Sequence, residues 1–239
     1  THAPTWTFRE CSRYGRLSDA ERDRFEALVA HAAVASNELW AEHGHHVLEV
    51  MKESSDMLPC AEDLGVVPEA VPRVLERLGI LGLNIPRWTY SWDAPEQPIV
   101  PFGEYPELSV CAPSVHDTST MRGWWENEEG REDLWEMLGM DGPCPTQFDP
   151  ATARQVYRGM LRAPSRIVVF ALQDLLALSP ELIHDDPEQE RVNVPGTYND
   201  FNWTWRMPLT LEELRRNPTL SAEVSALSAI RTSSGNSPT

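Results

Sequence analysis

Apolar residues near the start of the chain recur at helical spacing. Ser18 and Glu21 form a capping-box pattern, which marks the beginning of a helix. The apolar positions that follow are Phe25, Leu28, Val29, Ala32, Ala33 and Leu39. We therefore predict a long amphipathic helix from about residue 19 to about residue 42. Three histidines follow at 43, 45 and 46, and their spacing is more typical of a solvated helix end than of a metal site.

From residue 56 onward, short apolar runs alternate with helical stretches. The runs at 57–61, 80–85, 108–115 and 166–172 are interpreted as strands, and the last is continuously apolar, as a buried parallel strand should be. Helical patterns cover 67–78, 124–138 and 150–161. Repeated strand and helix units predict right-handed βαβ connections, so the expected fold class is α/β with a parallel sheet.

Four such units make only half of an eight-stranded barrel. An open half-barrel leaves two unpaired sheet edges and an uncovered interior, so we expect the chain to be the C-terminal half of something larger. The expected organisation is a helical insertion at 1–50, half of a TIM-barrel catalytic domain at 51–217, and a frayed or disordered tail at 218–239. That tail is rich in Ser, Thr and Ala.

Charge and cysteine content narrow the possible partners. The formal net charge is −17 and Lys52 is the single lysine, which argues against nucleic-acid binding. The four cysteines show no CxxC pair and no zinc spacing, so we expect buried structural thiols and no metal. No apolar run approaches the roughly 18 residues of a membrane span, and no targeting segment is recognisable. A soluble cytoplasmic protein is expected.

Two acidic residues follow predicted strands. Glu62 comes after the run at 57–61, and Asp117 follows the run at 108–115 together with His116. Strand ends at one barrel rim are where such folds carry catalytic groups. A carboxyl held in an apolar mouth stays protonated and can donate a proton to a leaving oxygen. Alternatively, Glu62 is a charge at the start of the next helix, although Asp63 suits that role better.

Asp117 has two interpretations that the residues alone leave open. Its carboxylate could cap the amides of Ser119 or Thr120. It could equally contact a ligand, because polar side chains directly after a buried strand are costly without a partner.

Aromatic rings crowd the predicted loops. They lie at 88, 90, 92, 124, 125, 198, 201, 203 and 205. Sugar faces stack on such rings, although packing in the core is the commoner use. The segment 191–206 combines Asn, Gly and Trp and is expected to fold back over the barrel rim after the last strand.

Four separated motifs resemble the 4-α-glucanotransferases, also called amylomaltases or disproportionating enzymes. They are Pro-Cys-Ala-Glu-Asp-Leu-Gly at 59–65, Ser-Val-His-Asp-Thr-Ser-Thr at 114–120, Leu-Gln-Asp-Leu-Leu at 172–176, and Val-Pro-Gly-Thr at 194–197 with Asn-Trp-Thr-Trp-Arg at 202–206. The motifs occur in order, and the segments 54–60 and 109–114 are most similar to the plant cytosolic branch.

The resemblance implies retaining transfer of α-1,4-glucan segments on a TIM barrel, with no metal or organic cofactor. It assigns the general acid/base to Glu62 and the stabilisation of the oxocarbenium-like transition state to Asp117. Substrate contacts would fall on His116, Trp125, Asn202, Trp203 and Arg206. The implied partners are maltooligosaccharides or glycogen.

One part of the family pattern has no counterpart in these residues. The family's nucleophile is an aspartate at the end of the fourth barrel strand, and Asp19 and Asp23, the only aspartates before residue 56, lie in a helical pattern. The predicted strands would then be the fifth to eighth, and activity would need the N-terminal half of the enzyme. The alternatives are an inactive α-glucan-binding fragment and a nonfunctional, poorly folding gene fragment.

Overall fold

The computed structural model describes residues 7–65, 67–92 and 94–233, with side chains given to residue 231. The chain divides into two compact units, each described below by itself. The first contains residues 1–59 and 66–80, and the second contains 60–65 and 81–239.

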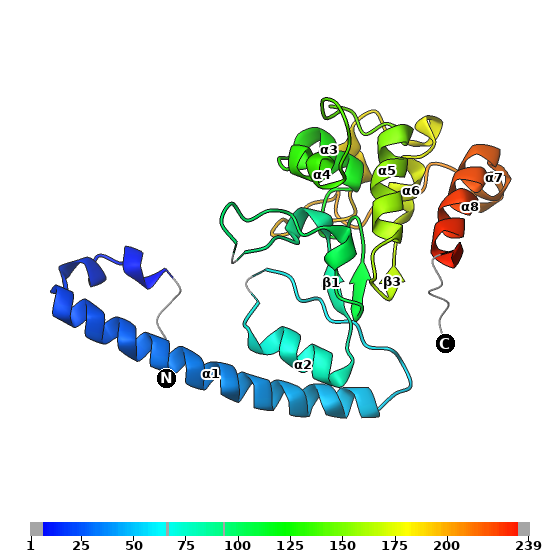
Figure 1. Cartoon of the computed structure of the whole chain (residues 1–239). Coiled ribbons are helices and arrows are strands. Elements are labelled where there is room, and N and C mark those ends of the chain that lie inside the picture. The colour runs from blue at the N-terminus through cyan, green and yellow to red at the C-terminus, as the bar shows by residue number, and fades with distance from the viewer. Residues whose placement is uncertain (1–6, 66, 93, 234–239) are drawn as a thin grey trace. The chain divides into compact units, whose positions relative to one another are not determined.

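The first unit is built around one long helix, α1 (Asp19–Glu53). Its start is as predicted, because Ser18 and Glu21 form the capping box. The helix continues beyond the predicted end, so the three histidines lie inside it and not at a solvated end. The reason is tertiary: α2 (Ala70–Leu78) lies alongside the C-terminal half of α1 (Figure 1), and Lys52 donates a hydrogen bond to the Leu78 carbonyl. Such packing outweighs the roughly 1 kcal/mol cost of a glycine within a helix.

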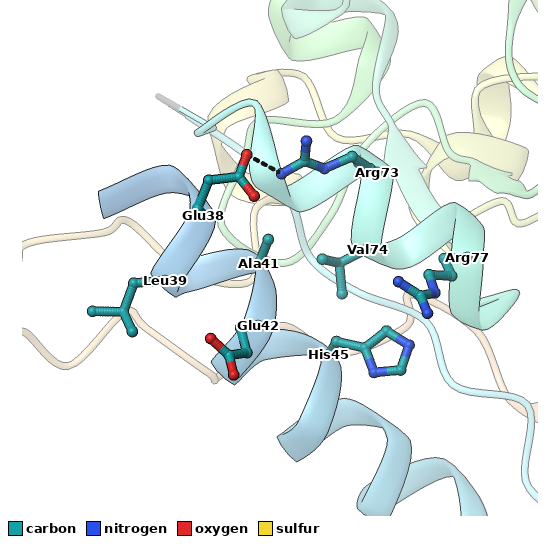
Figure 2. A pocket seen from close by; sticks show the side chains of 8 residues that line it. All are labelled: Glu38, Leu39, Ala41, Glu42, His45, Arg73, Val74 and Arg77. Carbon is teal, nitrogen blue, oxygen red and sulfur yellow. Dashed lines mark hydrogen bonds and ion pairs between the residues drawn. The ribbon is translucent and has the colours of Figure 1, made fainter. Parts of the chain in front are cut away.

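A groove of about 650 Å³ runs between α1 and α2, and Figure 2 shows the side chains that line it. Glu38 and Arg73 form an ion pair at 3.4 Å across it. Glu42 and Arg77 are also among the lining residues, so acidic and basic groups balance. Among the described residues, no Phe, Tyr or Trp side chain lines this groove, so it lacks the large flat ring on which a sugar face usually stacks.

The second unit contains a parallel sheet in the order β1 (Gly82–Asn84), β2 (Ser109–Cys111), β3 (Ile167–Val168). Gly82 pairs with Ser109, and Val110 pairs with Ile167. The predicted run at 57–61 shortens to a single parallel bridge between Cys60 and Leu81. Parallel order was therefore predicted correctly, and the expected α/β class is confirmed.

Six further helices are described in the second unit. They are α3 (Met121–Asn127), α4 (Arg131–Met137), α5 (Pro150–Leu161), α6 (Leu172–Leu176), α7 (Leu211–Arg216) and α8 (Pro218–Ser233). The pattern at 124–138, predicted as one helix, is two helices, because Gly130 has a φ of 102° and breaks the helical path. α5 matches its predicted bounds: Asp149 caps it by accepting from the Thr152 amide at 2.8 Å, and Pro150 occupies the first turn.

Aromatic side chains dominate the core of the second unit. The Trp125 and Phe148 ring centroids lie 5.4 Å apart, Phe148 and Tyr157 lie 6.0 Å apart, and Tyr157 meets Phe170 at 5.0 Å. α5 supplies Tyr157 and approaches the loops so closely at Gly159 that a side chain there would meet Phe102 and Leu138. The core therefore lies between α5, α3 and the segment before β2.

Residues 218–233, expected to belong to a frayed or disordered tail, form the helix α8. This helix packs against α5, and Leu220 and Leu227 are buried in the main core. Arg154 and Glu223 add an ion pair at 2.7 Å between the two helices. The prediction gave too little weight to these apolar positions. Residues 234–239 of the predicted tail lie outside the described part of the chain.

Two further expectations concern the burial of the cysteines and the presence of membrane-spanning helices. Only Cys111 is buried; Cys11 and Cys60 are exposed and Cys144 is intermediate, so the expectation of four buried thiols is wrong. Within the described residues, no helix combines the length and the apolar character that a membrane span requires.

Two helical glycines should respond in opposite ways to substitution by alanine. At Gly159 the added Cβ would lie 2.8 Å from both the Phe102 ring and Leu138, so we expect Gly159→Ala to lower the unfolding free energy by about 1–3 kcal/mol. Gly44 in α1 has nothing within 4 Å, so Gly44→Ala should raise stability by up to about 1 kcal/mol. Chemical denaturation of both variants tests this packing. An equal gain in both would contradict the close approach of α5.

Candidate active site

Asp117 lies in a tight turn shortly after β2. The Thr118 amide donates to the Val115 carbonyl at 3.1 Å, and the Thr118 hydroxyl accepts from the Val115 amide at 3.0 Å, so His116 and Asp117 occupy the turn centre. One carboxylate oxygen of Asp117 accepts from the Asn193 side-chain amide at 2.6 Å. The other lies 3.4 Å from His116 Nε2. Asp117 does not cap α3; Thr120 does, by accepting from the Gly123 amide at 3.1 Å.

The segment 191–206 folds back onto this turn. The Asn193 amide donates to the His116 carbonyl at 3.1 Å, and the Trp203 amide donates to the Val192 carbonyl at 2.7 Å. The rings of His116 and Trp203 lie 5.2 Å apart, and Trp203 is 65% exposed. Trp203 also has a φ of 65°, a conformation that only surrounding contacts can maintain in a non-glycine residue. An accessible indole face therefore lies beside the acidic turn.

Glu62 follows the Cys60 bridge and is exposed. Its neighbour Asp63 does not serve the N-terminus of α2, as the sequence suggested. Instead, Asp63 accepts from the Leu83 amide of β1 at 2.7 Å, which ties the segment 62–63 to the sheet. Since the bridge and the strands are all parallel, Glu62 and Asp117 both follow carboxyl ends at the same edge of the sheet.

A buried carboxylate holds both ends of the Asp117 segment. Asp174, on α6, is 1% exposed; one of its oxygens accepts from the Ser114 hydroxyl and the other from the Met121 amide at 2.7 Å. Tyr157 donates to the Asp174 carbonyl at 2.8 Å. Burial raises the pKa of Asp174 to about 6, and the bonds from Ser114 and Met121 partly oppose that rise.

A buried guanidinium supports the end of the same segment. Arg87 donates to the Ser119 hydroxyl at 2.6 Å and to the Ser119 and Thr120 carbonyls at 3.0 and 3.2 Å. Glu128 lies 3.6 Å away and balances the charge, and the guanidinium also lies over the Trp124 ring. Burial lowers the pKa of Arg87 to about 10, which leaves it charged at neutral pH.

Glu190 supplies a third buried ionic contact. It pairs with Arg122 at 2.7 Å and accepts from the Thr120 hydroxyl at 3.1 Å. Arg122 in turn donates to the His184 carbonyl at 2.6 Å. The acid thus links the Asp117 segment to the loop that leads into residues 191–206.

A pocket of about 170 Å³ opens beside the turn. Its lining includes the backbone or side chains of His116 and Val192, together with Gln173 from α6 and Glu190. This cavity lies next to His116 and is lined by residues of the turn, of α6 and of the segment that folds back onto the turn.

Three predicted substrate contacts differ from expectation or serve other roles. Trp125, predicted as a substrate contact, is 0% exposed and its indole N–H donates to the Pro145 carbonyl at 2.8 Å, so in this structure its ring packs in the core. Asn202 accepts from the Val194 amide and donates to Thr197, so it organises the loop that presents Trp203. Arg206 is exposed beyond this loop.

The nine aromatic residues singled out in the sequence divide into three groups. Trp124 and Trp125 belong to the core, Tyr90 and Trp205 are partly buried against it, and the exposed rings are Trp88, Trp92, Tyr198, Phe201 and Trp203. No group of three or more His, Cys, Asp and Glu side chains within the described residues could hold a metal ion.

The sequence reasoning missed Arg87, Asp174, Glu190 and Asn193 as residues of this site. Asp174 lies in a motif that the sequence singled out, but no role was attached to it. The others are held by partners about 30 to 76 positions away, so no local spacing could reveal them.

The model of one protein family matches most of the chain. The match covers residues 5–211 and carries the description 4-alpha-glucanotransferase. The chain belongs to the 4-alpha-glucanotransferase family. This confirms the resemblance that the four motifs indicated.

Individual relatives agree with the family match. A 4-alpha-glucanotransferase of Oryza sativa subsp. japonica (DPE2) is 33% identical over 98% of this chain and 24% of its own length. The 4-alpha-glucanotransferase of Chlamydia trachomatis is 34% identical over 77% of this chain and 34% of its own. The chain thus spans about a quarter to a third of these relatives.

A solved structure shares the fold. An amylomaltase from Streptococcus agalactiae, in complex with acarbose, superposes with a TM-score of 0.54 at 25% identity. The superposition covers 76% of this chain and 33% of the amylomaltase.

Replacing Asp174 with asparagine should remove a pH-dependent part of the stability. Because the folded state raises the pKa from 3.8 to about 6, the neutral carboxyl is preferred, and stability from this group falls as pH rises from about 4 to about 6. Two pKa units correspond to about 3 kcal/mol. The unfolding free energy of Asp174→Asn, relative to that of the original chain, should therefore rise by about 3 kcal/mol from pH 4 to pH 7. Denaturation curves at both pH values measure this, and a difference that does not vary with pH would contradict it.

Proposed function

We propose that this chain carries part of the active site of a retaining 4-α-glucanotransferase that moves α-1,4-glucan segments between maltooligosaccharides or glycogen. The observation that supports this best is the Asp117 turn, in which a half-exposed carboxylate held by Asn193 lies beside an accessible Trp203 ring. Carboxylates bind sugar hydroxyls, and flat rings stack on sugar faces. Family membership gives this arrangement its reaction.

In the proposed reaction, Glu62 and Asp117 have different roles. Glu62 protonates the leaving oxygen while the nucleophilic aspartate, which would come from outside these residues, forms a bond to the anomeric carbon. Glu62 then takes the proton from the acceptor hydroxyl, whose oxygen displaces that aspartate from the anomeric carbon. Asp117 holds sugar hydroxyls and stabilises the positive charge that develops at the anomeric carbon. His116 contacts the same sugar, and Trp203 stacks on a neighbouring one. Asn202 contributes by holding the loop, and Arg206 contacts the glucan further along.

We further propose that the sheet corresponds to barrel strands five to eight. In support, the Cys60 run, β1, β2 and β3 are parallel and ordered as they occur in the chain. Catalytic acids then fall at the carboxyl ends, as barrel enzymes require. The nucleophilic aspartate and barrel strands one to four would be supplied by sequence outside these 239 residues. A cytoplasmic location remains part of the proposal.

A second candidate function is binding of α-glucan without turnover. It is favoured by the fact that the turn, the Trp203 ring and the pocket beside His116 are complete within this chain. Chemistry would still require the nucleophile.

The role of Glu62 can be tested in the complete transferase that contains this chain. Glu62→Gln removes proton transfer but keeps the side-chain shape, so we expect disproportionation of maltotriose to fall by about 10²- to 10⁴-fold while maltooligosaccharide binding changes little. Glu69→Gln is the matched control, since Glu69 is also exposed and makes no capping hydrogen bond at α2. Near-normal turnover in the Glu62 variant would exclude the proposed role.

The two candidate functions differ in what the 239-residue chain does when it is combined with the remaining part of the enzyme. We expect the isolated chain to retain glucan binding, measured by affinity electrophoresis in glycogen-containing gels, and to release no glucose from maltotriose. Addition of the remaining part of the enzyme should restore transfer. Turnover by the isolated chain would show that the nucleophile lies within it, and failure of the remaining part to restore transfer would favour the binding function.

A further inference from the structure

Asp174 lies beneath the catalytic segment without lining it. Its carboxylate bridges Ser114 and Met121, which are the two ends of the segment that carries Asp117. Its own backbone is held by the Tyr157 hydroxyl from α5. The bridge therefore connects the segment to the core of the second unit through a residue that is 1% exposed.

The segment itself is a closed structure. Thr118 and Val115 are joined by hydrogen bonds in both directions, so the turn holding His116 and Asp117 keeps its internal shape. What this turn cannot set by itself is its place relative to the sheet. That place depends on its anchors, and Asp174 supplies one at each end of the segment.

From this geometry we infer that Asp174 is a positioning residue of the transferase: it sets the separation of Ser114 and Met121 and thereby the place at which Asp117 meets the reacting sugar. This inference rests on the proposed function. Displacement of a transition-state contact by a fraction of an ångström to one ångström lowers turnover more than substrate binding, because the ground state tolerates it better.

The substitution Asp174→Asn removes the charge but can keep the position of the segment. The new side-chain oxygen can accept from the Met121 amide, and the new side-chain amide can donate to the Ser114 hydroxyl oxygen, so both hydrogen bonds survive with the direction of one reversed. Asp174→Ala removes both hydrogen bonds. Ser114→Ala removes one tether and leaves the carboxylate in place.

The test measures kcat and KM for maltotriose disproportionation in the complete transferase. Positioning predicts that Asp174→Ala lowers kcat by at least about tenfold with KM changed less than about threefold. The kcat of Asp174→Asn should stay within about threefold of that of the original enzyme. The kcat of Ser114→Ala should lie between the values of the two Asp174 variants. The matched control is Asp149→Ala, which also removes a carboxylate that accepts from a backbone amide, at the start of α5. It should leave kcat unchanged.

Hydrogen exchange gives a readout that does not depend on activity. The Met121 amide should lose protection in Asp174→Ala and keep it in Asp174→Asn. If Asp174→Ala does not fold, Ser114→Ala and Asp174→Asn decide the question.

Three results would overturn the inference: unchanged kcat in folded Asp174→Ala or, if that variant does not fold, in Ser114→Ala; equal loss in Asp174→Asn and Asp174→Ala; or a comparable loss in Asp149→Ala. Absence of transfer in the unsubstituted enzyme would instead refute the proposed function.

Discussion

Parallel pairing of very short strands is the constraint on which the site depends. β2 pairs with β1 on one side and β3 on the other, and the Cys60 bridge extends the same direction. Since all these runs point one way, whatever follows them gathers at a single edge. Glu62 and Asp117, the two proposed catalytic acids, both lie toward that edge because of strand direction, although 54 residues separate them in the sequence.

The loops at that edge bury polar side chains, and charged side chains form hydrogen bonds with them. Ser114, Ser119 and Thr120 lie under the turn and would cost free energy if left without partners. Asp174, Arg87 and Glu190 satisfy them, and each also binds backbone. Buried ions give little net stability, because desolvation offsets their attraction, but they define one geometry. A defined position for Asp117 is what catalysis would require.

Local patterns predicted what local physics determines. The capping box placed the start of α1, and the Asp149 cap with Pro150 placed α5 within its observed bounds. Strand direction also followed from the alternation of elements. Patterns were less informative where distant residues decide: Trp125, to which the family resemblance assigned a substrate contact, packs against Phe148 and Trp135 in the core. Asp174 and Ser114 are 60 positions apart, so no spacing rule could pair them.

The exposure of Glu62 bears on how the proposed enzyme is divided. A carboxyl that must donate a proton near neutral pH needs partial shielding from water. In this chain Glu62 is exposed, and its neighbours Met57 and Leu58 are exposed as well. Among the described residues, β3 pairs with a strand on one side only, and so does the run at Cys60. Both the shielding and the outer strand partners would therefore come from the same source, namely further barrel strands and the bound glucan. On this argument the remaining part of the proposed enzyme would contribute more than a nucleophile: it would also complete the surroundings in which Glu62 can act as an acid.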